Sequence, residues 1–570
     1  MVNAMRHVVA RIYSRSHRNV VARIYSRAFV CMAVACVLAL GGCSKISTQS
    51  GGARPNGAAP IPGVLRYAEI VEPDSLSTLL STQVVTVDLS YLMFSYFFNV
   101  DNHDNFVPEI ATEVPTLANG GISADGKTIT YHMRPGVKWQ DGVPLTSRDI
   151  VFTYQAIMNP RNNVQVRAGY DQIASVEAKG VYTVVVHMKN VFAPIVAYFM
   201  GVQGGFSILP AHLLAQYPDL NHVAWNNAPV GSGPFKFVEW VHGDHITLEA
   251  NPLYWRGPPK LNKIIYRIVP DSNTIVTLLQ THELDAWFRA DPGKIGQLRG
   301  LSDYNVMISA ENVFGHVDFN VEDPILADVN VRRAIESAID RARIAADATN
   351  NVFVQTDTDQ SVFSWALDHH QPFYPYDPAK AAQLLDQDGW KVGPDGIRVK
   401  NGTRLSLQLS YVGGQSIAEK LGGLMQQEAK AVGIELTQKT YPGNLYFASK
   451  QSGGILNSGK FQLAYYGWVS GVDPDNSSLY RCNQFPPQGQ NTLFWCDRTL
   501  DAAEVDALTH VDQARRMRDY HIISTELGEQ APTVFLFAER RVDVMPTQFS
   551  GFSPSPAESA NWNAYDWSMQ

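Results

Sequence analysis

The chain has 570 residues, of which 45% are hydrophobic, and carries a formal net charge of −8. A chain of this length exceeds what one hydrophobic core normally serves, so we expect at least two lobes. The first 43 residues contain six Arg and no acidic residue, so the remainder carries −14 (40 basic, 54 acidic), which argues against a nucleic acid or an anionic membrane surface as the main partner.

The N-terminal segment has the pattern of a secretion signal. Residues 6–27 are basic and residues 28–42 are apolar, a stretch too short for a comfortable membrane span. Its end, Leu40-Gly-Gly-Cys43, resembles a bacterial lipobox, which implies that Cys43 becomes the lipidated first residue of a mature protein held at the outer face of a membrane. The alternative is an uncleaved anchor. Residues 44–62, rich in Ser, Gly, Pro and Ala, are expected to form a flexible tether.

The globular part begins near Val64 with a strand-like segment, Leu65 to Glu69. Residues 91–99 are aromatic and apolar, and periodicity leaves them open as a helix or a strand. The alternation of Thr128 to Met133 predicts a strand between two turns. Thr146 and Asp149 form a capping-box pattern that predicts a helix over 150–158.

Further along, helices alternate with strands, as in α/β lobes. Residues 331–345 place Val331, Ala342 and other small apolar residues on one face at helical spacing, which predicts a single helix. In 377–389, Asp377 is a predicted N-cap, Pro378 the first helical residue and Gly389 the stop. Residues 404–411 and 311–320 are predicted strands.

The stretch from Phe461 to Asn476 draws attention as a possible site. An apolar run, 461–466, is predicted to form a buried strand that breaks at Gly467 and delivers Trp468 and a Ser/Gly/Asp/Pro loop. A buried strand that ends in an aromatic residue and a polar loop often places ligand-contacting groups at a cleft, although a core strand with an ordinary turn fits these residues equally well.

Several stretches together resemble a known family, the peptide/nickel class of extracellular solute-binding proteins, which are receptors of ABC importers. They are 125–149, 229–237 followed by 251–255, 328–341 and 377–389, and the resemblance covers roughly 64–555. It implies an α/β bilobal clamp of the large, three-domain periplasmic-binding-protein type (type II), with the ligand held between lobes. The implied division is a signal peptide (1–43), a tether (44–62), lobe I (63–102, 227–316 and 531–570), a small inserted domain (103–226) and lobe II (317–530).

Motifs for catalysis or metal binding are incomplete. Gly454 to Lys460 has the spacing of a phosphate-binding loop, but Phe461 stands where Ser or Thr would bind Mg²⁺ and a strand follows. Asp368-His369-His370 offers adjacent side chains that rarely converge on one ion. Asp473 and Asp475 are too near in sequence to act as two opposed catalytic carboxylates. We therefore expect neither an enzyme nor a metal or cofactor site.

A binding protein instead needs an aromatic-lined cavity with a few placed polar groups. Trp468, with Tyr465 and Tyr466, is the predicted aromatic wall. The other predicted ligand-binding residues are Ser470, Gly471, Asp473, Asp475, Asn476, Phe314 and His316.

In the peptide-binding branch of the family, the residue three after this Trp is an Asp that pairs with the ligand's α-amino group. Gly471 stands at that position here. A buried cation without a carboxylate is costly, so either Asp473 substitutes for the missing Asp or the ligand lacks a free amino terminus.

Cys482 and Cys496 are the only Cys after residue 43 and flank a Pro/Gly/Gln-rich loop. Their spacing predicts a local disulfide, with two free thiols as the alternative. The leading functional hypothesis is a monomeric, lipid-anchored receptor that captures a peptide or peptide-like solute and presents it to an ABC permease. The alternatives are a sensor or assembly lipoprotein with the same fold and a secreted hydrolase.

Overall fold

The computed structural model describes residues 61–81, 83–164, 166–201, 203–368, 374–557 and 559–569. These residues all belong to one compact unit, 57–570. The predicted signal peptide, the lipidation site Cys43 and nearly all of the tether lie outside the described residues, as do His369 and His370. Within the described ranges, no helix is both long and apolar enough to cross a membrane.

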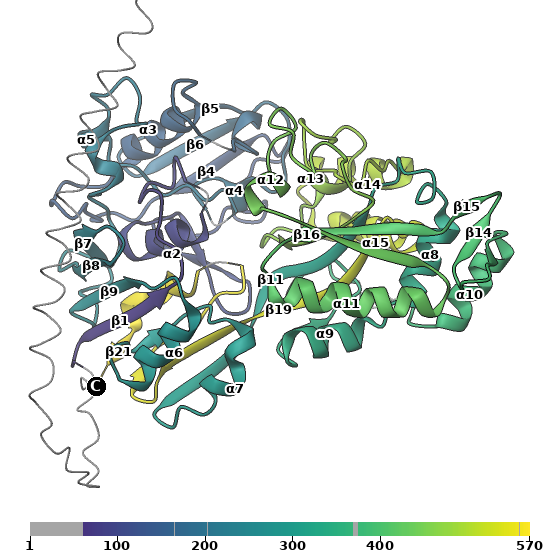
Figure 1. Ribbon diagram of the computed structural model, residues 1–570. Coiled ribbons are helices and arrows are strands. Elements are labelled where there is room, and N and C mark those ends of the chain that lie inside the picture. The colour runs from purple at the N-terminus through teal and green to yellow at the C-terminus, as the bar shows by residue number, and fades with distance from the viewer. Residues whose placement is uncertain are drawn as a thin grey trace, which may run out of the picture. The chain divides into compact units, whose positions relative to one another are not determined.

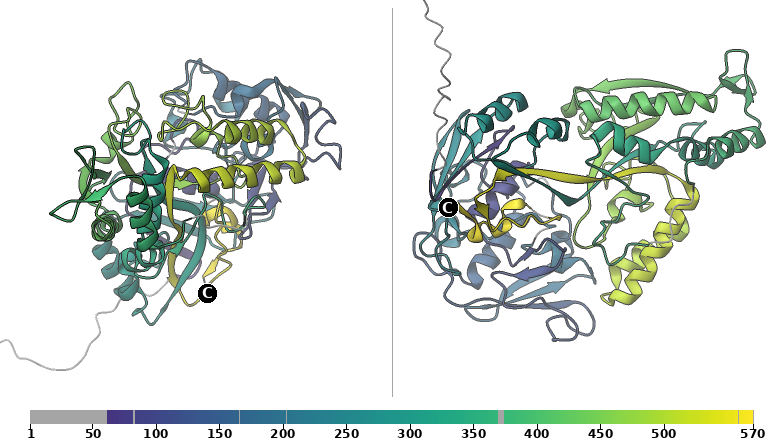
Figure 2. Two further views of the ribbon diagram at one scale, coloured as in Figure 1. Left: turned by 90° about the vertical axis from the view of Figure 1, so that its right-hand side faces the viewer. Right: turned by 90° about the horizontal axis from the view of Figure 1, so that it is seen from below.

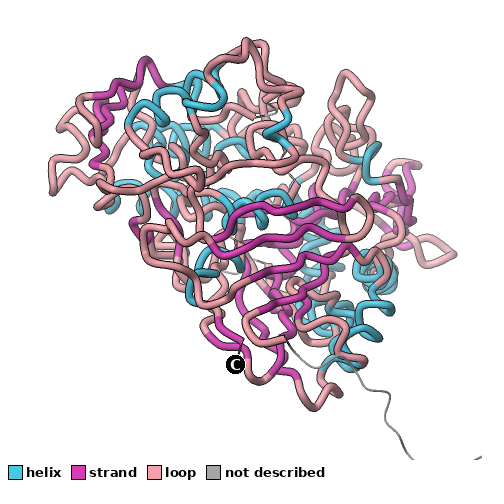
Figure 3. Tube along the Cα trace, turned by 90° about the vertical axis from the view of Figure 1, so that its left-hand side faces the viewer, coloured by secondary structure: helices cyan, strands magenta, loops and turns pink. Residues whose placement is uncertain are grey.

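An 11-stranded mixed sheet organises this unit. Its strand order is β17 (Glu435–Tyr441), β16 (Ser406–Val412), β18 (Leu463–Val469), β11 (Tyr304–Phe319), β19 (Thr533–Pro546), β10 (Ala286–Trp287), β1 (Val64–Glu69), β9 (Lys263–Ile268), β8 (His245–Ala250) and β7 (Phe235–Val241), with β12 (Val354–Gln355) also paired to β19. Figure 3 shows the strands of the β7 side lying next to one another.

Two long antiparallel strands, β11 and β19, join the two ends of this sheet (Figures 1 and 2). Two large hydrophobic cores lie along it. The first draws on residues between 65 and 288 and between 545 and 569. The second draws mainly on residues between 269 and 465 and between 534 and 544. The described residues thus contain more than one large hydrophobic core, while the predicted lobes and domain boundaries remain a prediction.

Smaller elements extend the first core. They are α2 (Val84–Met93), the pair β2 (Phe98–Val100) and β3 (Phe106–Pro108), the sheet of β4 (Thr128–His132), β6 (Thr183–Met188) and β5 (Ile173–Ala178), and the helices α3 (Ser147–Met158), α4 (Ile195–Tyr198) and α5 (Ala211–Leu214). The capping box predicted at Thr146 and Asp149 is present at the start of α3. The undecided stretch 91–99 divides between the end of α2 and the start of β2.

The second core is covered by helices on its side of the sheet (Figure 1). These and the remaining helices are α6 (Ser272–Gln280), α7 (Ile295–Leu298), α8 (Val329–Ala338), α9 (Arg341–Thr349), α10 (Pro378–Gln387), α11 (Ser416–Ala431), α12 (Gly443–Tyr446), α13 (Ser477–Tyr480), α14 (Arg498–Thr509) and α15 (Gln513–Gln530). The remaining short strands are β13 (Lys391–Val392), β14 (Arg398–Lys400), β15 (Thr403–Arg404), β20 (Phe549–Ser550) and β21 (Ser568–Met569).

The predicted single helix over 331–345 is wrong. The chain leaves the helix at Ile339, and the Asp340 side chain accepts a hydrogen bond from the Arg343 N–H to begin a second helix. Since N-cap residues favour such a restart, the face predicted to be continuous is interrupted, and Ala342 is exposed. The start of α10 is as predicted, with Asp377 as the N-cap and Pro378 in the first turn.

Candidate solute-binding site

Strand β18 carries the predicted site to the middle of the sheet. The sequence predicted a break at Gly467, but the strand continues to Val469. Its pairing with β11 extends through Gly315↔Gly467 and Val313↔Val469. On its other edge, the ladder with β16 contains only Leu463 and Ala464. Among the described residues, no strand therefore covers that edge of β18 from Gly467 to Val469.

The loop after β18 helps to form a cavity of about 10 Å³. Six of the eight predicted ligand-binding residues line it: Phe314, Trp468, Ser470, Gly471, Asp475 and Asn476. The structure thus brings together residues that lie more than 150 positions apart in the sequence. Asp473 and His316 are not among its lining residues.

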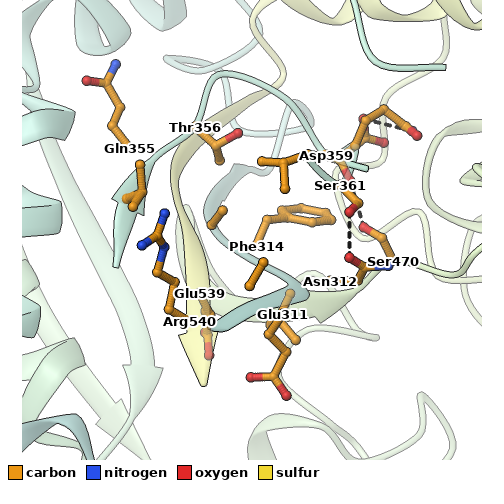
Figure 4. A pocket seen from close by; sticks show the side chains of 16 residues that line it. Glu311, Asn312, Phe314, Gln355, Thr356, Asp359, Ser361, Ser470, Glu539 and Arg540 are labelled. Atoms are coloured by element: carbon orange, nitrogen blue, oxygen red, sulfur yellow. Dashed lines mark hydrogen bonds between the residues drawn. The ribbon is translucent and has the colours of Figure 1, made fainter. Parts of the chain in front are cut away.

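A second cavity, of about 80 Å³, adjoins the first and is drawn in Figure 4. Both cavities are lined by Phe314, Asp359, Gln360 and Ser470. Ligand pockets typically measure about 300–1,000 Å³. The walls therefore meet in this conformation, and they must separate to admit a solute larger than a few water molecules.

An irregularity in the β11–β19 ladder forms one wall of the larger cavity. Ala310 pairs with Arg540 and Phe314 pairs with Ala538, so that the three residues between Ala310 and Phe314 oppose Glu539 alone. Irregular pairings of this kind are common beside functional sites because they redirect side chains. Here the irregularity brings Glu311 and Asn312 to the cavity.

Asn312 ties several segments together at this point. Its backbone carbonyl accepts a hydrogen bond from the Ser470 N–H (2.7 Å), and its side-chain amide donates to Asp104 (2.7 Å). Its side-chain oxygen accepts from the Ser361 hydroxyl (Figure 4). The β18 loop is thereby held to the Asn312 backbone, and Ser361 and residue 104 of the predicted inserted domain are held to its side chain.

Asp473 does not offer its carboxylate to the cavity. Both of its oxygens accept hydrogen bonds from the Arg516 guanidinium, at 2.8 and 2.6 Å, and the two side chains are only 11% and 7% exposed. The other expected position, Gly471, lies against the Gln203 side chain, which an added Cβ would approach to 2.0 Å. In this structure the Asp473 carboxylate is thus paired with Arg516, and its role as a substitute for the missing Asp stays a prediction.

His316 is an internal residue. It is 2% exposed, its ring meets Tyr466 edge-on at 4.2 Å between centroids, and its Nε2 lies 3.4 Å from the Asp318 carboxylate. Burial lowers the pKa of its imidazole. Tyr465 and Tyr466, expected in the aromatic wall, line neither cavity, so Phe314 and Trp468 form the aromatic lining.

Three acidic residues that line the cavities, Glu311, Asp359 and Glu539, were not among the site residues predicted from the sequence. Asp359, which is 4% exposed, accepts hydrogen bonds from the Asn476 amide (2.6 Å) and Gln360 (3.3 Å), and burial raises the pKa of its carboxyl group. Glu539 lies in a long apolar strand. Burial and the neighbouring Glu311 raise its pKa to about 7. The polar run around Asp359 was a weak sequence signal, whereas Glu539 gave none, because only the ladder irregularity brings it to the cavity.

The cysteines after the signal region lie just beyond this site. Cys482 and Cys496 are joined by a disulfide that closes the loop between α13 and α14. Within the described ranges, no group of three or more His, Cys, Asp or Glu side chains is arranged to hold a metal ion.

Comparison with known proteins identifies the family. The sequence model of the bacterial extracellular solute-binding proteins, family 5 (middle region), matches residues 105–489, more than half of the chain. The chain belongs to this family. The family consists of solute-binding proteins and not enzymes, which confirms the expectation from the sequence.

Similar proteins cover nearly the whole chain. The oligopeptide-binding protein AppA of Bacillus subtilis (strain 168) is 27% identical over 549 residues, which span 95% of this chain and 98% of the relative. Its solved structure in complex with a nonapeptide has a TM-score of 0.73 at 24% identity and covers 90% of this chain and 100% of its own. NikZ from Campylobacter jejuni, solved with Ni(L-His), has a TM-score of 0.75 at 24% identity and the same coverage. The predicted periplasmic-binding-protein fold is thus confirmed.

Proposed function

We propose that this family 5 protein is the substrate-binding lipoprotein of an ABC importer, and that it captures a peptide or peptide-like solute and presents it to a membrane permease. One observation supports a binding cleft beside Phe314 and Trp468. Six residues that were predicted from the sequence as ligand contacts line one cavity, and they come from β11, from β18 and from the loop that follows β18. The names of relatives, such as the oligopeptide-binding AppA and a putative ABC transporter peptide-binding protein of Brucella ovis, support a peptide-like cargo.

The uncovered edge of β18 supports the same cargo. From Gly467 to Val469 the strand has β11 on one side and no strand partner on the other within the described part of the chain. An extended peptide can add itself to such an edge through main-chain hydrogen bonds, with side chains entering pockets on alternate sides. Trp468 and Phe314 offer apolar contact beside that edge.

Capture requires the walls of the cleft to separate and then to close on the solute. Contacts across the cleft include hydrogen bonds and apolar packing. The Tyr198 hydroxyl donates to Asp475 (3.4 Å), and Gln203 exchanges hydrogen bonds with the Asp473 backbone (3.1 and 3.4 Å). Val472 packs against Val100 and Ala197. A solute that binds both walls stabilises the closed state by its differential affinity for the two states.

A thermal-shift and calorimetric screen tests the cargo. Di- to nonapeptides, sugars, nickel–histidine and haem are added to the purified protein, and any solute that co-purifies with it is identified by mass spectrometry. Saturable stabilisation by peptides without turnover is expected. Stabilisation by a sugar, a metal complex or haem alone would contradict the peptide-like cargo, and product formation would contradict the receptor itself.

The lipid anchor has its own test. Metabolic labelling with a radioactive fatty acid is expected to label the wild type but not Cys43→Ala, and the variant should move from the membrane fraction to the soluble fraction. A labelled Cys43→Ala would contradict the anchor.

A further inference from the structure

The cavities beside Phe314 are strongly acidic. Four carboxylates line them, from Glu311, Asp359, Asp475 and Glu539, and the guanidinium of Arg540 is the one basic group among their lining residues. Glu311 forms an ion pair (2.6 Å) with Arg289, which lines neither cavity. Negative charge remains in excess, and carboxylates that are withdrawn from solvent are costly without a cation or hydrogen-bond donors.

Glu539 is the carboxylate with no partner. It is half-buried, and no hydrogen bond or ion pair joins it to the part of the chain that the structure describes. Figure 4 shows Glu311 and Glu539 at the lower side of the cavity, whereas Arg540, the next residue on the strand, points toward Gln355. Among the described residues, no ion pair joins Arg540 to Glu539, and the charged groups that affect the Glu539 pKa are Glu311 and Arg289.

Gly467 leaves the Glu539 carboxylate uncovered from the side of β18. A Cβ at position 467 would lie 3.2 Å from the Glu539 oxygen, a close approach, and Gly467 itself is exposed. The carboxylate therefore lies beside the uncovered stretch of strand at which an added peptide would lie.

A second acceptor is unpaired on the other side of Phe314. Asn476 is 6% exposed and lines the smaller cavity, and its amide group donates to Asp359. That hydrogen bond fixes the orientation of the amide, since the reverse orientation would set two oxygens against each other. Among the residues that the structure describes, the side-chain oxygen of Asn476 has no hydrogen-bond partner. The cavities thus present acceptors that lack donors.

We propose that this site recognises a cationic nitrogen group of the solute, an ammonium or a guanidinium, with Glu539 as its principal counter-charge and the Asn476 oxygen as an added acceptor. The inference rests on the proposed peptide-like cargo and makes it more specific. It also explains how a solute can be held by a positive group when Gly471 provides no carboxylate and Asp473 is occupied by Arg516.

The experiment uses the full chain and five probes. Four are tripeptides, Ala-Lys-Ala and Ala-Gln-Ala, each with a free and with an acetylated amino terminus, and the fifth is 1,4-diaminobutane, a dication without peptide bonds. Affinities are measured by calorimetry for the wild type, for Glu539→Gln and for Glu322→Gln. Glu322 is an exposed acidic residue that lines neither cavity, so the last variant controls for the loss of one negative charge.

The wild type is expected to bind the cationic tripeptides about 10- to 100-fold more tightly than acetylated Ala-Gln-Ala, the range that a charge-assisted hydrogen bond provides. Glu539→Gln should remove most of that preference, leave the affinity for acetylated Ala-Gln-Ala within about twofold, and melt no earlier than the wild type, since it removes an unpaired charge. Glu322→Gln should behave as the wild type.

The outcomes separate the two proposals. If tripeptides bind without regard to charge, or if Glu539→Gln keeps the preference for cations, the cation site is refuted and the peptide cargo stands. If 1,4-diaminobutane binds through Glu539 while no tripeptide binds, the peptide cargo is refuted and the cation site stands. Failure of all five probes to bind the wild type would overturn both.

Discussion

The loop after β18 and the irregular part of the β11–β19 pairing both bring carboxylates close to the two cavities beside Phe314. The two regions differ in whether those carboxylates have partners. In the loop, Asp473 is matched by Arg516 and its backbone by Gln203. At the irregular β11–β19 pairing, Glu539 has no such partner within the described residues. A polar residue at the rim of a cleft is therefore available for binding only where the rest of the protein has left its hydrogen-bonding capacity unused.

The largest test of this contrast removes the charge of Asp473. Asp473→Asn leaves the buried Arg516 guanidinium without its counter-ion, and breaking a buried pair on one side typically costs about 3–5 kcal/mol. Urea denaturation should report a loss of that size. The matched control is Asp506→Asn, because Asp506 on α14 makes a similar two-point pair with Arg515, the neighbour of Arg516 on α15, but in a more exposed position, where we expect little change.

The two outcomes point to different roles for Asp473. A large loss of stability identifies a structural residue. A stable Asp473→Asn with weakened solute binding would instead make Asp473 the substitute anchor considered from the sequence, and it would break the contrast with Glu539.

The aromatic wall gives the next largest effect. Trp468 is half-buried and packs on the clusters of Phe314 and Tyr446. Trp468→Ala should weaken binding of a cognate peptide about 10- to 100-fold, since aromatic anchors dominate such sites, with a smaller effect on stability. Phe447→Ala is the control: its ring also contacts β18, at 6.3 Å from the Tyr466 ring, but it is 53% exposed and lines neither cavity.

Intrinsic fluorescence titration and thermal melting of both variants separate the contributions. If Trp468→Ala unfolds the protein, Trp468 belongs to the core and the aromatic wall is reduced to Phe314. If Phe447→Ala weakens binding equally, the wall extends beyond the two cavities.

The sequence predicted the fold better than the site. Capping residues and turns act locally, so the start of α3 at Thr146 and the start of α10 at Asp377 could be read directly. The break at Ile339 was missed because helical spacing continues across it while Asp340 starts a new helix. Family resemblance supplied the overall arrangement, which no local pattern contains.

The candidate site was predictable where it lies on one continuous stretch. Trp468, Ser470, Asp475 and Asn476 follow one another along the chain and line one cavity. What could not be predicted was pairing at a distance. The partner of Asp473 lies 43 residues away on α15, and Glu539 reaches the cavity only because β11 has extra residues opposite it. Such facts depend on tertiary register, which residue types do not encode locally.

A pH titration sharpens the account of Glu539. With a pKa near 7, its carboxyl group is mostly protonated at pH 6 and mostly ionised at pH 8. The charged groups facing it are Glu311 and Arg289, which raise and lower that pKa respectively, and Arg540 is the adjacent residue. Only the ionised form attracts a cation, so affinity for a cationic probe should rise about tenfold from pH 6 to pH 8.

Calorimetry with acetylated Ala-Lys-Ala across this range measures the effect, with Glu539→Gln as the reference, because the Lys ammonium stays charged throughout whereas a free α-amino group would titrate. The variant should show a flat profile in the same range. A rise of equal size in the variant would assign the titration to another group, such as Asp359 or Asp475, and would shift the proposed counter-charge to the loop side of Phe314.

The smallest effect concerns the closure of the loop wall. Gln203 accepts from the Asp473 N–H (3.1 Å) and donates to its carbonyl (3.4 Å), and hydrogen bonds of this kind contribute about 0.5–1.5 kcal/mol each. Gln203→Ala should therefore speed hydrogen exchange of the Asp473 amide about five- to tenfold, while Gln216→Ala, at an exposed site whose amide bonds only a nearby carbonyl, should not. Unchanged exchange at Asp473 would mean that the loop is held by its other contacts, such as the Asp473–Arg516 pair and the Ser470–Asn312 hydrogen bond, and that Gln203 does not contribute to closing this wall.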